Sequence, residues 1–256
     1  MKKLLTLTLA LTLLLAACSE AQPSSSAPAS TPAPAVSSEA PSTTETPAPT
    51  PESVESTDIA SAKPESQPEE SAQSNILIAY FTLPEDVNTE GVDAISGASI
   101  IMRDGVKLGS CEFVAKTVQE TIGGDLFQIE TVQQYPLDHD PLVDQAADEK
   151  AAELRPELAV QLENLDQYDT IILGYPNWWA DLPMPVYTFL EEYDFAGKTI
   201  IPFVTHGGSG FSNTVGAIAA LQPGATVSEN TLSIARGDVV NCEKNVIDWA
   251  KGLDLN

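Results

Sequence analysis

Residues 168–181 read YDTIILGYPNWWAD, and this stretch decides the fold class. Its first half is a short, nearly continuous apolar run, which is typical of a strand buried on both faces of a parallel sheet. Gly174, Pro176 and Asn177 then favour a loop that leaves the sheet at the carboxyl end of the strand. Open α/β sheets bind their ligands at that edge, so we interpret the loop as a binding segment.

Two adjacent tryptophans, Trp178 and Trp179, lie in this loop. An indole has a large, rigid and flat apolar surface, which suits stacking against a flat aromatic ligand. A single tryptophan at this place could equally pack against the edge of the core. A neighbouring pair on a loop is explained better by a ligand than by packing alone.

The segments on either side of this strand predict the same architecture. Further strands are indicated by apolar runs at 75–82, 125–131 and 199–205 and by the later half of 226–235. Helices are predicted at 111–122, 142–165, 185–193 and 214–221, with a last one after residue 238. Because strand and helix alternate five times, we predict a doubly wound α/β domain around a five-stranded parallel sheet.

The connection after the first strand is long and has a pattern of its own. Residues 84–110 have the character of an insertion between the first strand and the first helix. Within it, Asp104-Gly105 separates two β-favouring runs at 98–102 and 106–108. This spacing predicts a hairpin insertion after the first strand.

The beginning of the chain has the pattern of a secretory signal peptide. Lys2 and Lys3 precede an apolar stretch, and the segment ends in Leu15-Ala16-Ala17-Cys18. This ending resembles a bacterial lipobox. The resemblance implies cleavage after residue 17, attachment of diacylglycerol and palmitate at Cys18, and a lipid anchor on the extracytoplasmic face of the cell membrane. An ordinary signal peptide or an uncleaved anchor are the alternatives.

The chain therefore divides into three segments: a signal peptide at 1–17, a tether at 18–74 that begins with the lipidated Cys18, and a folded domain at 75–256. The tether is rich in Ser, Pro, Thr, Ala and Glu and has few large apolar residues, so it is predicted to be disordered.

The net charge of the chain is −25. Such an acidic chain is not expected to bind nucleic acid or anionic lipid directly, so contact with the membrane is expected through the lipid anchor only. Besides Cys18, the cysteines are Cys111 and Cys242. An exported protein with two such cysteines could form one disulfide, but they lie far apart in the sequence, and we predict that both remain free thiols.

Taken together, these segments resemble the flavodoxin-like family. The resemblance depends on residues 78–82, 174–179 and 205–211 and extends over nearly all of 75–256. It implies the strand order 2-1-3-4-5 and FMN bound non-covalently between the loops after the third and fourth strands. The residues implied in cofactor binding are Trp178 or Trp179 for ring stacking, Pro176 and Asn177 for backbone contacts, and Thr205, His206, Gly207 and Gly208 around the other side.

The phosphate of FMN is expected in the loop after the first strand, against a helix N-terminus. The family has a hydroxyl-rich loop there. In this chain Thr82 matches its first position, the insertion intervenes, and the loop resumes at Ser110 and Cys111. A thiol is a weaker hydrogen-bond donor than a hydroxyl, so the chain departs from the family pattern at Cys111. A position at a helix start is expected to lower the pKa of this thiol.

The sequence thus predicts an extracytoplasmic, membrane-anchored FMN protein that acts in electron transfer with a redox partner of unknown identity. One alternative is an FMN-dependent NAD(P)H:quinone-type oxidoreductase. Another is a flavodoxin fold that has lost its cofactor and serves as a surface binding module.

Other kinds of site have less support. The segment 207–211, GGSGF, does not fit the Gly-x-Ser-x-Gly pattern of a hydrolase, and no Gly-x-Gly-x-x-Gly motif follows the first strand. His139 stands between two aspartates in a polar loop, but no second cluster accompanies it, so we predict no metal site. A loop of this kind is typically solvent-facing; the alternative is that His139, which follows the second predicted strand, approaches the edge of the ligand.

Overall fold

The computed structural model describes residues 75–255. The predictions for the signal peptide, the tether and Cys18 concern residues outside this part of the chain. No helix within residues 75–255 combines the length and the apolar character that crossing a bilayer requires.

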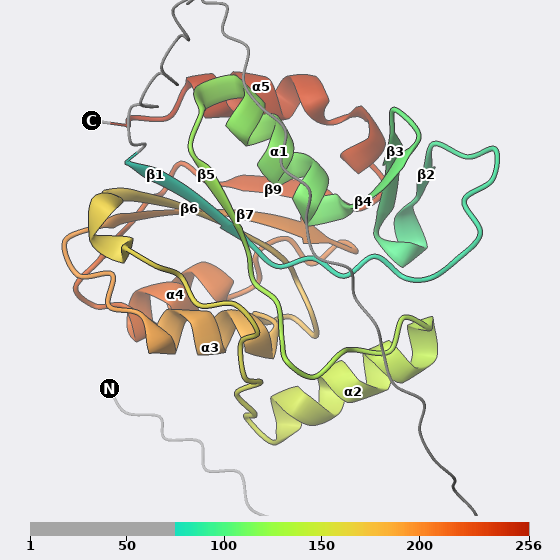
Figure 1. Ribbon diagram of the computed structural model, residues 1–256, viewed down its shortest axis with the longest axis horizontal. Helices are drawn as coiled ribbons and strands as arrows, with labels where there is room; N and C mark the ends of the chain where they lie inside the picture. Colours follow the sequence, from blue (N-terminus) through green and yellow to red (C-terminus); the bar gives the residue numbers. More distant parts are fainter. Residues whose placement is uncertain (1–74, 256) are drawn as a thin grey trace, which may run out of the picture. The chain divides into compact units, whose positions relative to one another are not determined.

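A six-stranded parallel sheet forms the centre of the domain (Figure 1). Its strands follow the order β5-β1-β6-β7-β8, and β9 also pairs with β7. The strands are β1 (Ile76–Tyr80), β5 (Asp125–Gln128), β6 (Thr170–Pro176), β7 (Thr199–His206), β8 (Thr226–Val227) and β9 (Leu232–Ala235). The predicted doubly wound α/β fold is confirmed. The sheet has six strands instead of five because the polar run 228–231 divides the last predicted strand into β8 and β9.

Helices cover both faces of this sheet. Figure 1 shows α1 (Ser110–Ile122) and α5 (Glu243–Lys251) on one face, and α3 (Met184–Glu192) and α4 (Thr214–Leu221) on the other. Successive residues of a strand point to opposite faces, so Ile78 packs in the cluster under α1 and α5, while Leu77 packs in the cluster above α3 and α4. Both side chains are almost fully buried, and the sheet therefore separates two apolar cores.

Two helices differ from their predicted bounds. The predicted helix at 142–165 is α2 (His139–Ala151), which begins earlier and ends much earlier. Glu153 has a left-handed backbone with φ 50°, and Pro156 lacks the N–H that a longer helix would need. The last helix begins at Glu243, after a separate 3₁₀ turn at Val239–Asn241.

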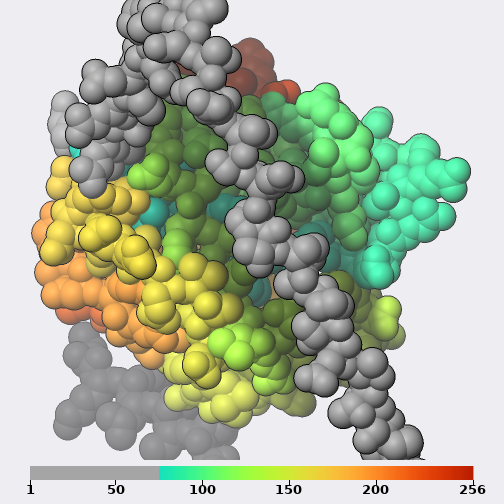
Figure 2. Space-filling model, in the orientation of Figure 1, coloured from blue at the N-terminus to red at the C-terminus, as the bar shows by residue number. Residues whose placement is uncertain are grey.

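The insertion after β1 folds as a small antiparallel sheet in the order β2-β3-β4. Its strands are β2 (Ala94–Ile95), β3 (Ile100–Arg103) and β4 (Val106–Gly109), with a 3₁₀ turn, η1 (Ser96–Ala98), between the first two. The predicted hairpin is confirmed. Asp104 and Gly105 have φ values of 52° and 78°, which are the positive values that a two-residue hairpin loop requires. Figure 2 shows part of the insertion projecting from the right-hand edge of the molecule.

The insertion and α2 both lie at the carboxyl edge of the central sheet (Figure 1). β4 continues without a break into α1. The insertion is therefore joined to a core helix at one end and to β1 at the other, which fixes it beside the edge where parallel strands present their loops.

Candidate functional site

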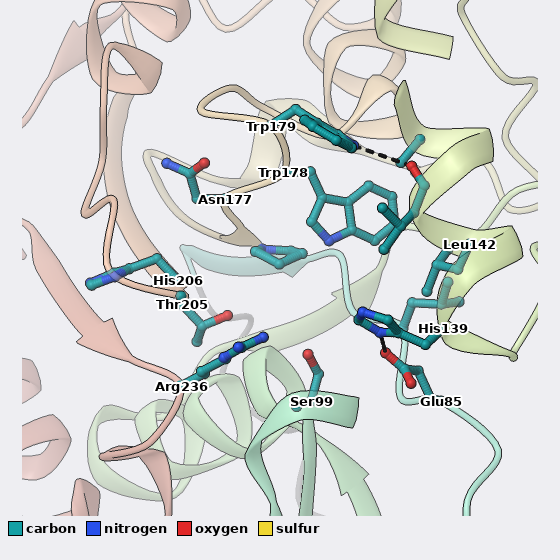
Figure 3. Close-up of a pocket in the computed structure, with 16 residues that line it drawn as sticks. Glu85, Ser99, His139, Leu142, Asn177, Trp178, Trp179, Thr205, His206 and Arg236 are labelled. Carbon is teal, nitrogen blue, oxygen red and sulfur yellow. Dashed lines mark hydrogen bonds and ion pairs between the residues drawn. The ribbon is translucent and has the colours of Figure 1, made fainter. Parts of the chain in front are cut away.

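A cavity opens at the carboxyl edge of the sheet (Figure 3). Its walls come from the insertion, from α2 and from the loops after β6, β7 and β9. Most of the residues predicted to hold a cofactor line it, namely Pro176, Asn177, Trp178, Trp179, Thr205, His206 and Gly207. Four predicted residues do not, namely Thr82, Ser110, Cys111 and Gly208.

The two tryptophans have different surroundings. The Trp178 ring meets Phe81 and Tyr135 edge to face, with ring centroids 5.3 and 5.9 Å apart. The Trp179 side chain is 53% exposed, and its indole N–H donates to the backbone carbonyl of Val143 on α2 at 3.2 Å. Trp178 is thus a core residue with one side in the cavity, whereas Trp179 forms an outer wall attached to α2.

The loop that holds these tryptophans has a strained backbone. Trp179 and Ala180 have φ values of 53° and 60°, which are unfavourable for residues with a side chain by about 1–2 kcal/mol each. Paired backbone hydrogen bonds between Trp178 and Asp181, of 3.1 and 3.0 Å, close the turn. The Lys150 ammonium donates to the Trp179 carbonyl at 2.6 Å. Strain maintained by such contacts is common where a loop positions a side chain for binding.

Asn177 links the two loops that form the back of the cavity. Its backbone N–H donates to the carbonyl of Thr205 at 2.8 Å, and its side-chain amide donates to the carbonyl of Gly210 at 2.8 Å. Its Oδ1 atom is buried and has no hydrogen-bond partner among residues 75–255. A buried acceptor without a donor is unfavourable by about 1–3 kcal/mol, and a ligand N–H would remove that penalty.

His206 shapes the loop after β7. The N–H of Gly208 donates to His206 Nδ1 at 2.9 Å, and His206 Nε2 lies 3.0 Å from the hydroxyl oxygen of Ser233. Since Nδ1 accepts, Nε2 carries the proton and donates it to Ser233. Figure 3 shows the ring directed away from Trp178. The His206 side chain therefore holds the loop of Gly207 and Gly208 in place. Gly208 has a φ of 128°, a backbone conformation that favours glycine.

His139 enters the cavity wall from the first turn of α2. Its Nδ1 atom lies 2.7 Å from the Glu85 carboxylate of the insertion, and the hydrogen bond to this carboxylate raises the pKa of the imidazole. The His139 side chain is 54% exposed and the Glu85 side chain 9%. The pair ties the insertion to α2 and places the His139 imidazole in the wall of the cavity.

The residues predicted to bind phosphate are buried. Thr82, Ser110 and Cys111 are each less than a tenth exposed. The sulfur of Cys111 lies 3.2 Å from the Thr205 hydroxyl, and burial raises the pKa of the thiol to about 12. The expectation of a lowered pKa is wrong, because the loss of water around the thiol outweighs its position at a helix start.

The start of α1 is occupied by groups of the chain itself. The N–H of Ser110 donates to the carbonyl of Ser99 at 2.9 Å, and the N–H of Gly109 donates to the Glu112 carboxylate at 3.2 Å. A Cβ at Gly109 would lie 2.1 Å from the Thr82 hydroxyl oxygen, so the two segments touch. Ser110 Oγ is buried and has no partner among residues 75–255.

Some cavity residues did not emerge from the sequence. Glu85, Ser99 and Arg236 are the polar ones. Arg236 follows β9, and its backbone N–H donates to the carbonyl of His206 at 2.7 Å. The signal that could have identified Arg236 is its place at the carboxyl end of the last predicted strand, which meets the same edge of the sheet. The described residues contain no cluster of His, Cys, Asp and Glu that could hold a metal ion.

A family model described as flavodoxin matches residues 105–251. Among solved structures, a candidate flavoprotein from Bacteroides eggerthii is 25% identical with a TM-score of 0.52 and covers 69% of this chain and 96% of its own. A candidate flavoprotein from Bacteroides uniformis is 28% identical with a TM-score of 0.49 and covers 70% and 99%.

A flavoprotein from Lactobacillus acidophilus, solved in complex with FMN, is also similar. It is 19% identical with a TM-score of 0.45, and the match covers 69% of this chain and 98% of that one. No curated protein matches the chain.

Proposed function

Because this chain belongs to the flavodoxin family, we propose that it binds FMN non-covalently in the cavity and acts in electron transfer. The observation that carries the proposal is the wall of two tryptophans, Trp178 and Trp179, at the carboxyl edge of the sheet. FMN, when bound, supplies reversible electron transfer, and the protein contributes binding, orientation and electrostatics.

The residues around the cavity fit a flat, heterocyclic ligand. Trp178 is held rigidly by Phe81 and Tyr135, which suits a fixed stacking surface. Asn177 offers a buried acceptor that matches a ring N–H. Gly207 has no side chain, so its backbone can approach a ring closely.

Titration of the purified full chain with FMN tests this function. We expect saturable quenching of tryptophan fluorescence and a perturbed flavin absorption spectrum. Trp179→Ala should weaken FMN binding about tenfold or more, since stacking on an aromatic side chain contributes about 1–3 kcal/mol per base-like ring.

A control variant and a contradicting outcome accompany this titration. Trp249 on α5 packs against Phe203, and Trp249→Phe should leave FMN affinity unchanged. Absence of saturable binding at millimolar FMN would contradict the proposal and would favour a flavodoxin fold that serves as a surface binding module.

His139 favours a second candidate function, an FMN-dependent NAD(P)H:quinone-type oxidoreductase. Its Nδ1 atom is bonded to Glu85, while its Nε2 atom has no described partner, and its raised pKa keeps the ring protonated closer to neutral pH. A proton donor at the cavity suits the reduction of a substrate better than electron transfer alone. Oxidation of NAD(P)H by the FMN-loaded chain with a quinone, weakened in His139→Gln, would support this candidate. An electron carrier would show neither.

We also propose that Cys18 carries a lipid that anchors the chain to the extracytoplasmic face of the cell membrane. The support is the Leu15-Ala16-Ala17-Cys18 ending of the signal peptide and the polar segment that follows it. Cys18→Ser should move the protein from the membrane fraction to the soluble fraction. Intact-mass spectrometry should find two or three acyl chains on the wild-type chain, and an unmodified cysteine would refute the anchor.

A further inference from the structure

We propose that Arg236, together with the insertion at Ser99, holds the phosphate of the ligand, in place of the start of α1. This inference rests on the proposed FMN binding and names a part of that site. The ligand chemistry is a phosphate monoester, which is dianionic at neutral pH.

Arg236 differs from the other arginines of the chain. Arg103 forms ion pairs with Glu120 and Glu243, and Arg155 forms a two-point pair with Glu191. The guanidinium of Arg236 has no ion pair and no hydrogen bond within the described part of the chain. Arg236 is exposed, so its guanidinium is open to a ligand.

The fold fixes where this guanidinium lies. In the β7–β9 pairing His206 faces Ala235, so Arg236 is the next residue at the carboxyl edge. Its backbone N–H is bonded to the His206 carbonyl. Figure 3 shows its side chain reaching into the cavity close to Ser99 and Thr205. A guanidinium presents paired N–H groups in a plane, a geometry that matches two oxygens of a phosphate.

The charges around Arg236 leave it available to an anion. The carboxylate in the cavity wall is Glu85, and it is bonded to His139. Glu85 is therefore already paired with a basic side chain, and a guanidinium without a carboxylate partner favours an anion at its place in the cavity wall.

The start of α1 is less suited to phosphate than its position suggests. The Glu112 carboxylate already accepts from the N–H of Gly109, so a negative charge of the protein lies where a phosphate would be expected. The N–H of Ser110 is bonded to the Ser99 carbonyl. Ser110 Oγ is buried and has no described partner, so a phosphate could also be bound there, and Ser110→Ala provides the competing variant.

The test compares FMN with riboflavin, which has the same ring and lacks the phosphate. Dissociation constants for both are measured by fluorescence titration of the purified full chain and its variants. We expect the wild-type chain to bind FMN at least about tenfold more tightly than riboflavin, the size of a charge-assisted contact. Arg236→Gln should abolish this preference while leaving riboflavin affinity unchanged, and Arg236→Lys should restore part of it.

Control variants show whether a lost preference for FMN comes from the missing Arg236 contact, from the change in net charge or from unfolding. Lys244→Gln removes one positive charge from the exposed pair with Asp248 on α5 and should keep the preference for FMN. Ser110→Ala should also keep it. Unchanged riboflavin affinity in Arg236→Gln shows that the cavity is still folded, and thermal unfolding of each variant checks this independently.

Four results would overturn the inference. A preference for FMN that survives Arg236→Gln, or one that is lost in Ser110→Ala instead, would return the phosphate to the start of α1. Equal binding of FMN and riboflavin by the wild-type chain would show that the phosphate is not recognised, while the proposed flavin site would stand. Failure of the wild-type chain to bind either flavin would refute the proposed function, and this inference with it.

Discussion

The start of α1 and the rim of the cavity meet at Ser99, yet their polar groups are used in opposite ways. At the start of α1, backbone N–H groups are bonded to Ser99 and Glu112, and the Cys111 thiol is buried against Thr205. At the rim, the guanidinium of Arg236 and Nε2 of His139 have no described partners. Each region also holds one buried oxygen without a described partner, Ser110 Oγ at the start of α1 and Asn177 Oδ1 at the back of the cavity.

This difference teaches how a binding edge can move within a fold. Buried polar groups that satisfy one another stabilise the protein, whereas polar groups left open at a cavity are available to a ligand. The insertion after β1 brings Ser99 and Glu85 to the edge of the sheet and at the same time covers the start of α1. The same segment therefore closes one candidate site and helps to build another.

The largest expected effect comes from the tryptophan that belongs to both the core and the rim. Trp178→Ala should lower the free energy of unfolding by about 3 kcal/mol, because its ring fills space against Phe81 and Tyr135. Trp179→Ala should lower it by less than about 1 kcal/mol, since that ring is mostly exposed. Denaturant unfolding without flavin measures both. Equal losses would mean that the loop is one structural unit and that the distinction between the two rings is wrong.

A somewhat smaller effect is expected at the start of α1. Gly109→Ala places a methyl group against the buried Thr82 and should destabilise the protein by about 1–3 kcal/mol through overpacking. Gly97→Ala is the matched control. Gly97 also lies in the insertion and lines the cavity, and no atom lies within 4 Å of its Cβ position. Thermal unfolding of the two variants measures the contrast. A neutral Gly109→Ala would show that the start of α1 has room for a ligand.

The fold was predictable from the sequence to the extent that periodicity and turn chemistry encode it. Asp104-Gly105 predicted the hairpin because few residues tolerate positive φ at two successive positions. The helix predicted to reach residue 165 ends at Ala151, because Glu153 adopts a left-handed backbone and Pro156 lacks the N–H that a longer helix needs. The break between β8 and β9 was only partly visible, because four polar residues in an apolar region can belong to a strand or interrupt it.

The site was predictable where it depends on strand ends and not where it depends on packing between distant segments. Trp178 and Trp179 follow a recognisable strand, so their place at the edge could be inferred. Glu85 and Ser99 reach the cavity only because the insertion folds back over α1, which no local pattern announces. Glu112 did carry a signal, since a Glu three residues after a helix cap is typical of a capping box.

A modest effect is expected at the contact between the insertion and α2. Glu85 raises the pKa of His139, so the pair stabilises the folded state fully just below the ordinary histidine pKa of about 6.5, and that stabilisation is lost as the pH rises through the raised pKa. The loss should be less than about 1 kcal/mol, because the imidazole is half exposed. NMR titration of the chain's two histidines should find His139 above its ordinary pKa of about 6.5.

Glu85→Gln supplies the check on this titration. It should bring the pKa of His139 back toward the ordinary value, because it removes the carboxylate that raises it. A His139 pKa that does not respond to Glu85→Gln would show that the insertion does not contact α2 in solution.

The smallest expected effect is an absence of thiol chemistry. Burial raises the pKa of Cys111 and of Cys242 to about 12, so both thiols stay neutral at pH 8. In a Cys18→Ser background, both should react with a thiol reagent at least about a hundredfold more slowly than a free cysteine, and denaturant should release both. Fast labelling of Cys111 alone would show that the start of α1 opens to solvent. The start of α1 and the rim of the cavity would then differ less in how accessible their polar groups are.

The hydrogen bond from Asn177 to Thr205 has a consequence for the order of events in the life of the protein. This hydrogen bond is the last one between the β6 and β7 segments. The cavity is also lined by Ser99 and Arg236, which lie more than a hundred residues apart in the chain. The binding site thus comes into being only when the whole sheet is assembled. If the chain is exported before it folds, it must bind its flavin outside the cytoplasm. The absorption of the bound flavin would then show that the protein has been exported and that its sheet is fully assembled.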